Sequence, residues 1–184
     1  LLTIIAGLNA ITGGLIGLNQ RHLRTIIAYS SITHLGWIFR LISIIKPVIA
    51  LVYFILYSSI ITPIFILFNI KSITNRNHIN KISSLSPMIQ ILIPLLLISL
   101  SGMPPFTGFI PKWLTISTVS TYRYVLVIIL IIGSIINTYF YLNILFNTIL
   151  RNQINTSQTE KSLYLKIPSF IALRSLFLLP ILFI

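Results

Sequence analysis

Long apolar runs follow one another along nearly the whole chain, and only 8% of its 184 residues are charged. A soluble domain carries about 25% charged residues, so this chain has too few to cover a water-facing surface. Lipid offers no hydrogen bonds to backbone N–H and C=O groups, so an unclosed chain can cross a bilayer only as helices. The sequence therefore predicts an all-α, polytopic membrane protein.

We expect one transmembrane domain that covers residues 1–184, with about six membrane helices. The last helix is the weakest of them, because Arg174 lies inside it. Four glycines in the first helix predict close packing against a neighbouring helix. The expected helices are Leu1–Leu18, Thr25–Ile45, Val48–Ile70, Pro87–Thr121, Tyr124–Leu150 and Pro168–Ile184.

The fourth apolar run is interrupted by the stretch SGMPPFTGFIPKW, residues 101–113. Proline has no N–H donor and disfavours helix before it, and glycine tolerates unusual dihedral angles. Irregular backbone at membrane depth is tolerated where it is buried in protein or lines a wet cavity. We therefore predict a helix over 87–121 that is broken near its middle. The polar or backbone positions that would support this break are Ser101, Pro104, Pro105, Thr107 and Pro111.

The length of residues 87–121 leaves open whether this stretch crosses the membrane once or twice. One straight helix of this length would span about 52 Å, which exceeds a hydrocarbon core of about 30 Å. Two crossings would need about 40 residues. One crossing places eight loop bases on one side and three near the other: Arg21, Arg24, Lys71, Arg76, Lys81, Arg151, Lys161 and Lys166, against Arg40, Lys46 and Arg123. Two crossings would give six against five, so the positive-inside rule predicts one crossing with the more basic side inside.

Two titratable residues lie at membrane depth, and both are candidates for proton transfer. Lys112 follows the break, about 15 Å from the end of its helix. A lysine there is costly, and burial disfavours its charged form, so it can exchange a proton; the alternative is a side chain that extends to the headgroups. His34 lies near the middle of its helix, with Ser30 and Ser31 on the same face. Histidine changes charge near neutral pH and can pass protons through water, although it can equally be packed and hydrogen-bonded.

Several function classes are excluded or disfavoured by composition. The chain has no cysteine and one acid, Glu160, which excludes thiol chemistry and a nucleophile–base–acid site. It has no glycine-rich phosphate loop and no metal-ligand cluster. The net charge of +12 comes from bases scattered between apolar runs, which fits membrane orientation better than nucleic-acid binding. We therefore expect no catalytic, cofactor-binding or metal-binding residues, and no redox chemistry, on this chain.

The residues GLNQRHLRTIIAYSSITHLGW (Gly17–Trp37) and SGMPPFTGFIPKW, in this order and spacing, resemble the subunit 2 family of mitochondrial NADH:ubiquinone oxidoreductase, respiratory complex I. The resemblance continues through NTYFYLNILF (Asn137–Phe146) and is weak after Arg151. It implies an antiporter-like fold of two inverted five-helix repeats, each with one broken helix. Residues 1–150 would be the second repeat and 168–184 a final helix. Lys112 would be the lysine of the membrane proton path, and His34 would lie on the same hydrophilic axis.

The resemblance also sets expectations about partners. The chain opens on Leu1 and the family's first repeat, with its acidic and basic groups, is absent. We therefore expect the chain to be incomplete, or a second polypeptide to supply that repeat. Other membrane and peripheral subunits of complex I, and the lipid bilayer, would surround the chain. FMN, Fe–S clusters and ubiquinone would bind to other subunits, and no cofactor is expected here.

The leading interpretation is a proton-translocating subunit of the mitochondrial inner membrane, driven by NADH oxidation and ubiquinone reduction elsewhere in the complex. The 40 isoleucines against 5 valines suggest an AT-rich organelle genome, because packing does not distinguish these two residues. Two alternatives remain open at this point. The chain could belong to a cation/proton antiporter, or it could be a structural scaffold without its own proton path.

Overall fold

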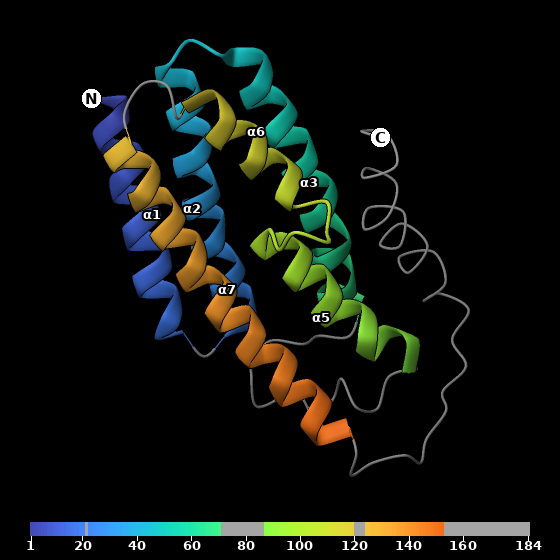
Figure 1. Cartoon of the computed structure of the whole chain (residues 1–184). Helices are drawn as coiled ribbons and strands as arrows, with labels where there is room; N and C mark the ends of the chain where they lie inside the picture. Colours follow the sequence, from blue (N-terminus) through green and yellow to red (C-terminus); the bar gives the residue numbers. More distant parts are fainter. Residues whose placement is uncertain (21, 71–86, 120–123, 153–184) are drawn as a thin grey trace.

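A computed structural model describes residues 1–20, 22–70, 87–119 and 124–152 of the chain (Figure 1). The expected last helix, Pro168–Ile184, lies outside these residues, as do Arg21, Arg123 and the loops at 71–86 and 153–167. The regular elements in the described part are all helices, as the sequence predicts. They are α1 Leu2–Leu18, α2 Leu23–Ser43, α3 Pro47–Ile70, α5 Pro87–Ser101, α6 Phe109–Val119 and α7 Tyr124–Asn152.

Small residues bring α1 close to α2 and α7, and this confirms the packing that the glycines predict. A Cβ atom on Gly13 would lie 2.7 Å from the backbone oxygen of Tyr29, on α2. A Cβ on Gly36 would lie 2.8 Å from the oxygen of Ala6, and one on Gly133 of α7 would lie 2.5 Å from the oxygen of Ala10. The backbones therefore approach more closely than any residue with a side chain would allow.

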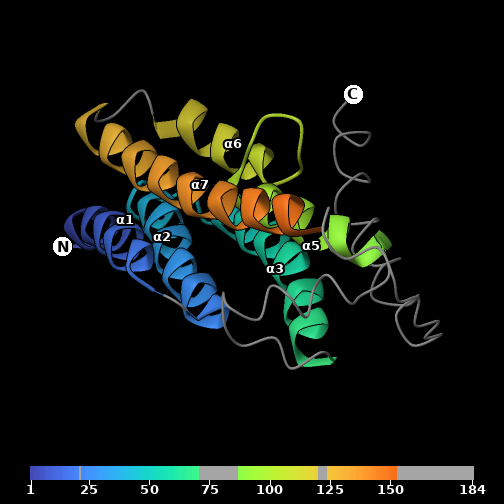
Figure 2. The same cartoon turned by 90° about the horizontal axis from the view of Figure 1, so that it is seen from below.

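α2 lies at the centre of the bundle and contacts α1, α3, α6 and α7. Seen from below, α1, α2 and α3 lie along one side and α6 and α7 along the other (Figure 2). At its C-terminus α2 ends in a tight turn: Ile45 has a φ of 60°, and the N–H groups of Ile45 and Lys46 donate to the carbonyls of Ile42 and Leu41. This is a Schellman turn, which reverses the chain into α3.

α5 and α6 form one broken crossing, because they follow each other in the same direction through the bundle (Figure 1). Their 15 and 11 residues span about 22 and 16 Å, which together suit a single bilayer. The predicted break near the middle of 87–121 is therefore confirmed, and it occupies residues 102–108.

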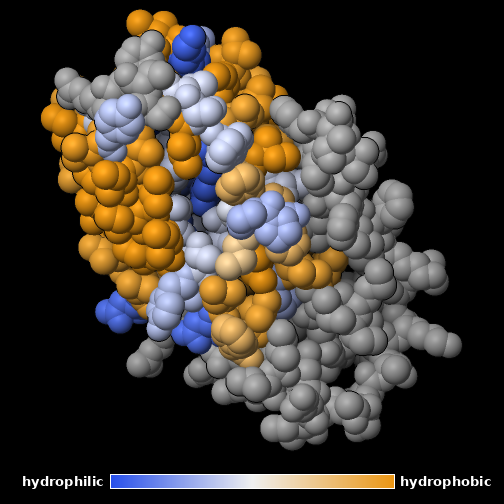
Figure 3. All heavy atoms as spheres, viewed as in Figure 1, coloured by the Kyte–Doolittle hydropathy of each residue, from blue (hydrophilic) through white to orange (hydrophobic). Residues whose placement is uncertain are grey.

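Two of the described helices, α3 and α7, are long and apolar enough to cross a membrane by length and composition alone. α1 is shorter, at 17 residues, and α5 and α6 each supply part of a crossing. On the face shown in Figure 3, apolar residues cover the flank over α1 and α7, whereas polar residues gather along the middle around a hollow. The face in this view is thus apolar along its flank and polar along its middle.

Candidate functional site

The break between α5 and α6 depends on two glycines. Gly102 has a φ of 80°, a conformation that residues with a Cβ rarely adopt, and its N–H donates to the Ser99 carbonyl over 3.0 Å. A Cβ on Gly108 would lie 1.8 Å from that same carbonyl oxygen. The end of the break therefore folds back directly against the last turn of α5.

The last four carbonyls of α5 have no backbone N–H partners within the helix, and side chains and the first residue of the break supply partners for them. The Ile98 carbonyl accepts the Ser101 hydroxyl over 2.6 Å, and the Ser99 carbonyl accepts the Gly102 N–H. The Leu100 carbonyl faces the ring of His34. The Ser101 carbonyl accepts a hydrogen bond from a lysine. The negative end of this half-helix is thus directed at the interior of the bundle.

The lysine is Lys112, in the first turn of α6. It is only 6% exposed, and its Nζ donates to the Ser101 carbonyl over 2.5 Å. Its aliphatic part packs on Gly102, because a Cβ there would lie 2.8 Å from Cδ of the lysine. The side chain therefore points back into the break and is enclosed by protein, so it does not extend to the headgroups.

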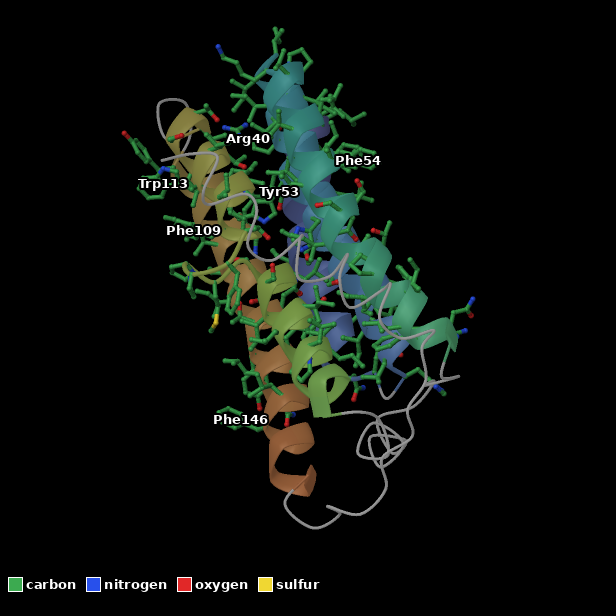
Figure 4. The ribbon with its side chains drawn as sticks, turned by 90° about the vertical axis from the view of Figure 1, so that its right-hand side faces the viewer. Arg40, Tyr53, Phe54, Phe109, Trp113 and Phe146 are labelled. Atoms are coloured by element: carbon green, nitrogen blue, oxygen red, sulfur yellow. The ribbon has the colours of Figure 1, made fainter. Side chains whose placement is uncertain are left out.

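His34 lies inside the bundle at 5% exposure, in the middle of α2. Its Nδ1 is 2.9 Å from the hydroxyl of Tyr53 on α3, and its ring lies 4.8 Å from the ring of Tyr57. Figure 4 shows Tyr53 pointing into the bundle and its neighbour Phe54 pointing outward. His34 therefore faces polar groups, and the ring nitrogen that faces Tyr53 either donates or accepts.

His34 and Lys112 belong to one site, although they are 78 positions apart in the sequence. α2 contacts α6, and the two side chains are close enough for their charges to interact. The end of α5 lies between them, because its Leu100 and Ser101 carbonyls face one side chain each. The site thus has two groups that can carry a proton, joined by backbone carbonyls that favour positive charge.

The supporting positions predicted from the sequence fall into two groups. Ser101 caps the end of α5, and the Thr107 hydroxyl is 3.2 Å from the Ser99 hydroxyl across the break. Pro111 is buried in the first turn of α6, whereas Pro104 and Pro105 are exposed at the tip of the break.

On α2, the hydroxyls of Ser30 and Ser31 donate to the carbonyls three residues earlier, those of Ile27 and Ala28. They stay on the face of α2 that carries His34, but neither bonds to the histidine in the described structure. The sequence predicts the shared face correctly, and their part in proton transfer stays a prediction.

Four residues of the site are missed by reasoning from the sequence alone: Ser99, Tyr53, Tyr57 and Tyr141. The two tyrosines of α3 are four positions apart, a spacing that puts them on one face of a helix and could have identified them. Tyr141 gives no such signal, because it lies among other aromatic residues of α7.

Asn137 of α7 donates to the Thr33 hydroxyl of α2, and this hydrogen bond links the two helices. Two of the bases that the charge count places near the less basic side lie at the end of α2. Lys46 is exposed in the turn after α2. Arg40 instead is 3% exposed and donates to the Ser43 hydroxyl over 3.5 Å, so protein encloses it near the end of α2.

Comparison with known proteins places this arrangement in a family. The family model described as NADH:quinone oxidoreductase/Mrp antiporter, TM, matches residues 1–137. A relative from Lumbricus terrestris named NADH-ubiquinone oxidoreductase chain 2 is 43% identical over 144 residues, which are 78% of this chain and 43% of the relative. Another of the same name, from Metachirus nudicaudatus, is 35% identical and covers 97% of this chain and 53% of its own length. The chain thus spans about half the length of these relatives.

A chain in the solved structure of respiratory complex I from Thermus thermophilus with bound aureothin has the same fold, with a TM-score of 0.69. It is 18% identical, and the match covers 95% of this chain and 40% of that one. The likeness in structure concerns the fold alone, whereas the family model covers about three quarters of the chain. The chain belongs to the NADH:quinone oxidoreductase/Mrp antiporter family of transmembrane proteins.

Proposed function

We propose that this chain is a membrane subunit of respiratory complex I in the mitochondrial inner membrane, and that it contributes half of a proton path. The names of the relatives from Lumbricus and Metachirus support complex I over an antiporter. In this proposal the enzyme is a proton-translocating NADH:ubiquinone reductase, and this chain is one subunit of it. FMN, Fe–S clusters and ubiquinone would bind to other subunits.

The observation that carries the proposal is the position of Lys112. A buried ammonium group requires a partner, and the described residues contain no Asp or Glu. Its hydrogen-bond partner is the carbonyl of Ser101, at the negative end of a half-helix. A carbonyl stabilises the charged form less than a carboxylate does, so this lysine can lose its proton at modest cost. A scaffold without a proton path would have no need to bury a lysine here.

In this proposal, Lys112 and His34 each bind and release a proton. Lys112 holds a proton as an ammonium against the Ser101 carbonyl and releases it as a neutral amine. His34 can take up a proton on its ring, which lies beside the Leu100 carbonyl. Because their positive charges repel, protonation of one favours release from the other. Subunits that carry the redox reaction would drive this exchange by changing the charge near the site.

A carboxylate on another polypeptide, or on a further segment of this protein, would complete the path. The resemblance to the family implies a first repeat that forms the other half of the fold. We propose that this repeat supplies the carboxylate.

Substitution of Lys112 by methionine tests the proposal in the assembled complex. Lys112→Met keeps the length and apolar packing of the side chain and removes the exchangeable proton. We expect NADH-driven proton pumping in sealed membrane vesicles to fall by tenfold or more, about the effect of losing a proton-transfer group. Lys112→Arg should also impair pumping, because arginine stays charged.

Lys46→Met is the matched control, because it removes an exposed lysine in the turn after α2. It should assemble and pump as the native complex does. If Lys112→Met assembles and pumps at the native rate, Lys112 does not handle protons and the proposed path is wrong.

A further inference from the structure

Tyr53 of α3 is a buried phenol whose hydroxyl lies against the ring of His34. It is 1% exposed, and its oxygen is 2.9 Å from Nδ1 of the histidine, a normal hydrogen-bond distance. The contact joins α3 to the middle of α2. Because a buried polar group that loses its partner is destabilising, this pair holds both side chains in one arrangement.

The ring of Tyr53 is fixed in place by apolar packing. It belongs to a buried cluster that also contains Trp37 and Leu41 of α2 and Ala50 of α3. Packing of this kind holds the ring and its oxygen, whereas the hydroxyl hydrogen still rotates to suit its partner. The oxygen therefore stays beside Nδ1, and its hydrogen can point toward that nitrogen or away from it.

Two further titratable groups face the ring of His34, but their hydrogen bonds go elsewhere. The ring of Tyr57 lies 4.8 Å from the histidine ring, yet its hydroxyl is directed at Ser31. Lys112 of α6 is close enough for its charge to act on the ring, yet its Nζ donates to the end of α5. The hydroxyl of Tyr53 is therefore the side-chain group that can respond when the ring changes charge.

A backbone carbonyl determines which ring nitrogen is bare in the neutral histidine. The Leu100 carbonyl of α5 faces the ring, and a carbonyl can only accept a hydrogen bond. A neutral imidazole has a single N–H group. When that N–H is donated to Leu100, Nδ1 carries a lone pair and accepts from the Tyr53 hydroxyl. Both nitrogens of the neutral ring then have partners.

We propose that Tyr53 is a positioning residue whose hydroxyl donates to Nδ1 of neutral His34 and accepts from Nδ1 of the imidazolium. Its role in pumping rests on the proposed function. When Nδ1 gains a proton, the hydroxyl turns about its C–O bond and presents its oxygen; when the proton leaves, the hydroxyl turns back. The tyrosine keeps its own proton throughout. One phenol thus serves both charge states of the ring, where the described residues contain no Asp or Glu.

Tyr53→Phe tests this role, because it keeps the packed ring and removes only the hydroxyl. In the assembled complex, we expect NADH-driven pumping in sealed vesicles to fall by about tenfold, the effect of losing one hydrogen bond to a group that becomes charged. Tyr139→Phe is the matched control, because this tyrosine of α7 is 63% exposed. It should pump at the native rate.

The pH dependence of the loss distinguishes a partner of His34 from a residue that only supports the fold. A hydrogen bond to the charged ring is stronger than one to the neutral ring, so removal of the hydroxyl mainly disfavours the charged ring. Relative to the native complex, the loss in Tyr53→Phe should therefore be larger at about pH 8 than at about pH 6. Any loss in Tyr57→Phe should be the same at both pH values, because that hydroxyl is directed at Ser31.

A high-resolution cryo-EM map of the native complex gives a readout that does not depend on pumping. We expect the Tyr53 oxygen within hydrogen-bond distance of Nδ1 of His34. A native map that separates these atoms overturns the inference, as does a Tyr53→Phe variant that pumps like Tyr139→Phe or loses pumping equally at both pH values. If that happens while Lys112→Met has lost pumping, only the role of Tyr53 is wrong. If Lys112→Met pumps at the native rate, the proposed function fails whatever the result at Tyr53.

Discussion

Single atoms decide where the buried Lys112 side chain lies. Lys112 is held by one backbone carbonyl, that of Ser101, and by the absence of a side chain on Gly102. A Cβ on Gly102 would meet the lysine's aliphatic carbons at 2.8 and 3.0 Å. The Lys112 side chain therefore fills space that a side chain at position 102 would otherwise occupy.

Gly108 offers the sharpest test at the residue scale. In Gly108→Ala the new Cβ would lie 1.8 Å from the Ser99 oxygen, which belongs to backbone and cannot rotate away. Overpacking typically costs about 1–3 kcal/mol, and this overlap is severe, so we expect a loss at the upper end of that range. The amount of assembled complex and its thermal stability would measure it.

The control for this change is Gly7→Ala on α1, where the nearest atom to a new Cβ is 3.9 Å away. It should be close to neutral. Equal stability of the two alanine variants would mean that the break is not packed as described.

Sequence reasoning locates the break and Lys112 because proline, glycine and a lone cation in an apolar run are strong local signals. It also places His34 with Ser30 and Ser31, since helical periodicity fixes a shared face. It does not find Tyr53 as the partner of His34, because that contact depends on how α3 is turned against α2. Sequence reasoning also does not reveal that Arg40 is buried, because the local sequence does not show which side chains another helix covers.

At the scale of helices, the position of α2 depends on its contact with α1. Both are held together by small residues at Gly13 and Gly36, and Gly13 lies against Thr33, the residue before His34. A change in the packing of α1 against α2 should therefore alter the site around His34, even when the changed residue lies outside that site.

Gly13→Ala tests that coupling. Its Cβ would lie 2.7 Å from the Tyr29 oxygen and 2.9 Å from the Thr33 nitrogen, so α1 and α2 must separate. We expect a destabilisation of about 1–3 kcal/mol, seen as a lower thermal midpoint of the complex, and reduced pumping in what assembles. Gly7→Ala on the same helix is again the control. Native stability in Gly13→Ala would contradict the close α1–α2 packing.

At the scale of the whole molecule, the described interior combines two apolar clusters with a smaller set of buried polar groups, and large apolar side chains also face outward. Phe109 and Trp113 illustrate this on α6, where their rings lie side by side, 5.8 Å apart, on the outer surface (Figure 4). Trp113 is 58% exposed and directly follows the buried Lys112. Adjacent residues of one short helix thus face the outside of the bundle on one side and the break between α5 and α6 on the other.

The orientation of this bundle in the membrane can be tested with single cysteines, because the native chain contains none. Asn19 lies exposed between α1 and α2, next to the basic residues that the positive-inside rule assigns to the matrix. Ile45 is 84% exposed in the turn between α2 and α3, at the opposite end of α2. We expect Asn19→Cys to react with a membrane-impermeant maleimide only in inside-out vesicles. Ile45→Cys should react only when the intermembrane side is accessible.

Both substitutions suit their positions. Asn19 caps the C-terminus of α1 through its backbone N–H, which cysteine also has, and cysteine at 45 relieves a branched side chain from a positive φ. Detergent-solubilised complex, in which both cysteines should react, controls for burial by a neighbouring subunit. If each cysteine is labelled from the opposite side, the bundle has the inverse orientation in the membrane. The end of α2 that carries Arg24 would then face the intermembrane space, and the positive-inside rule would fail for this chain.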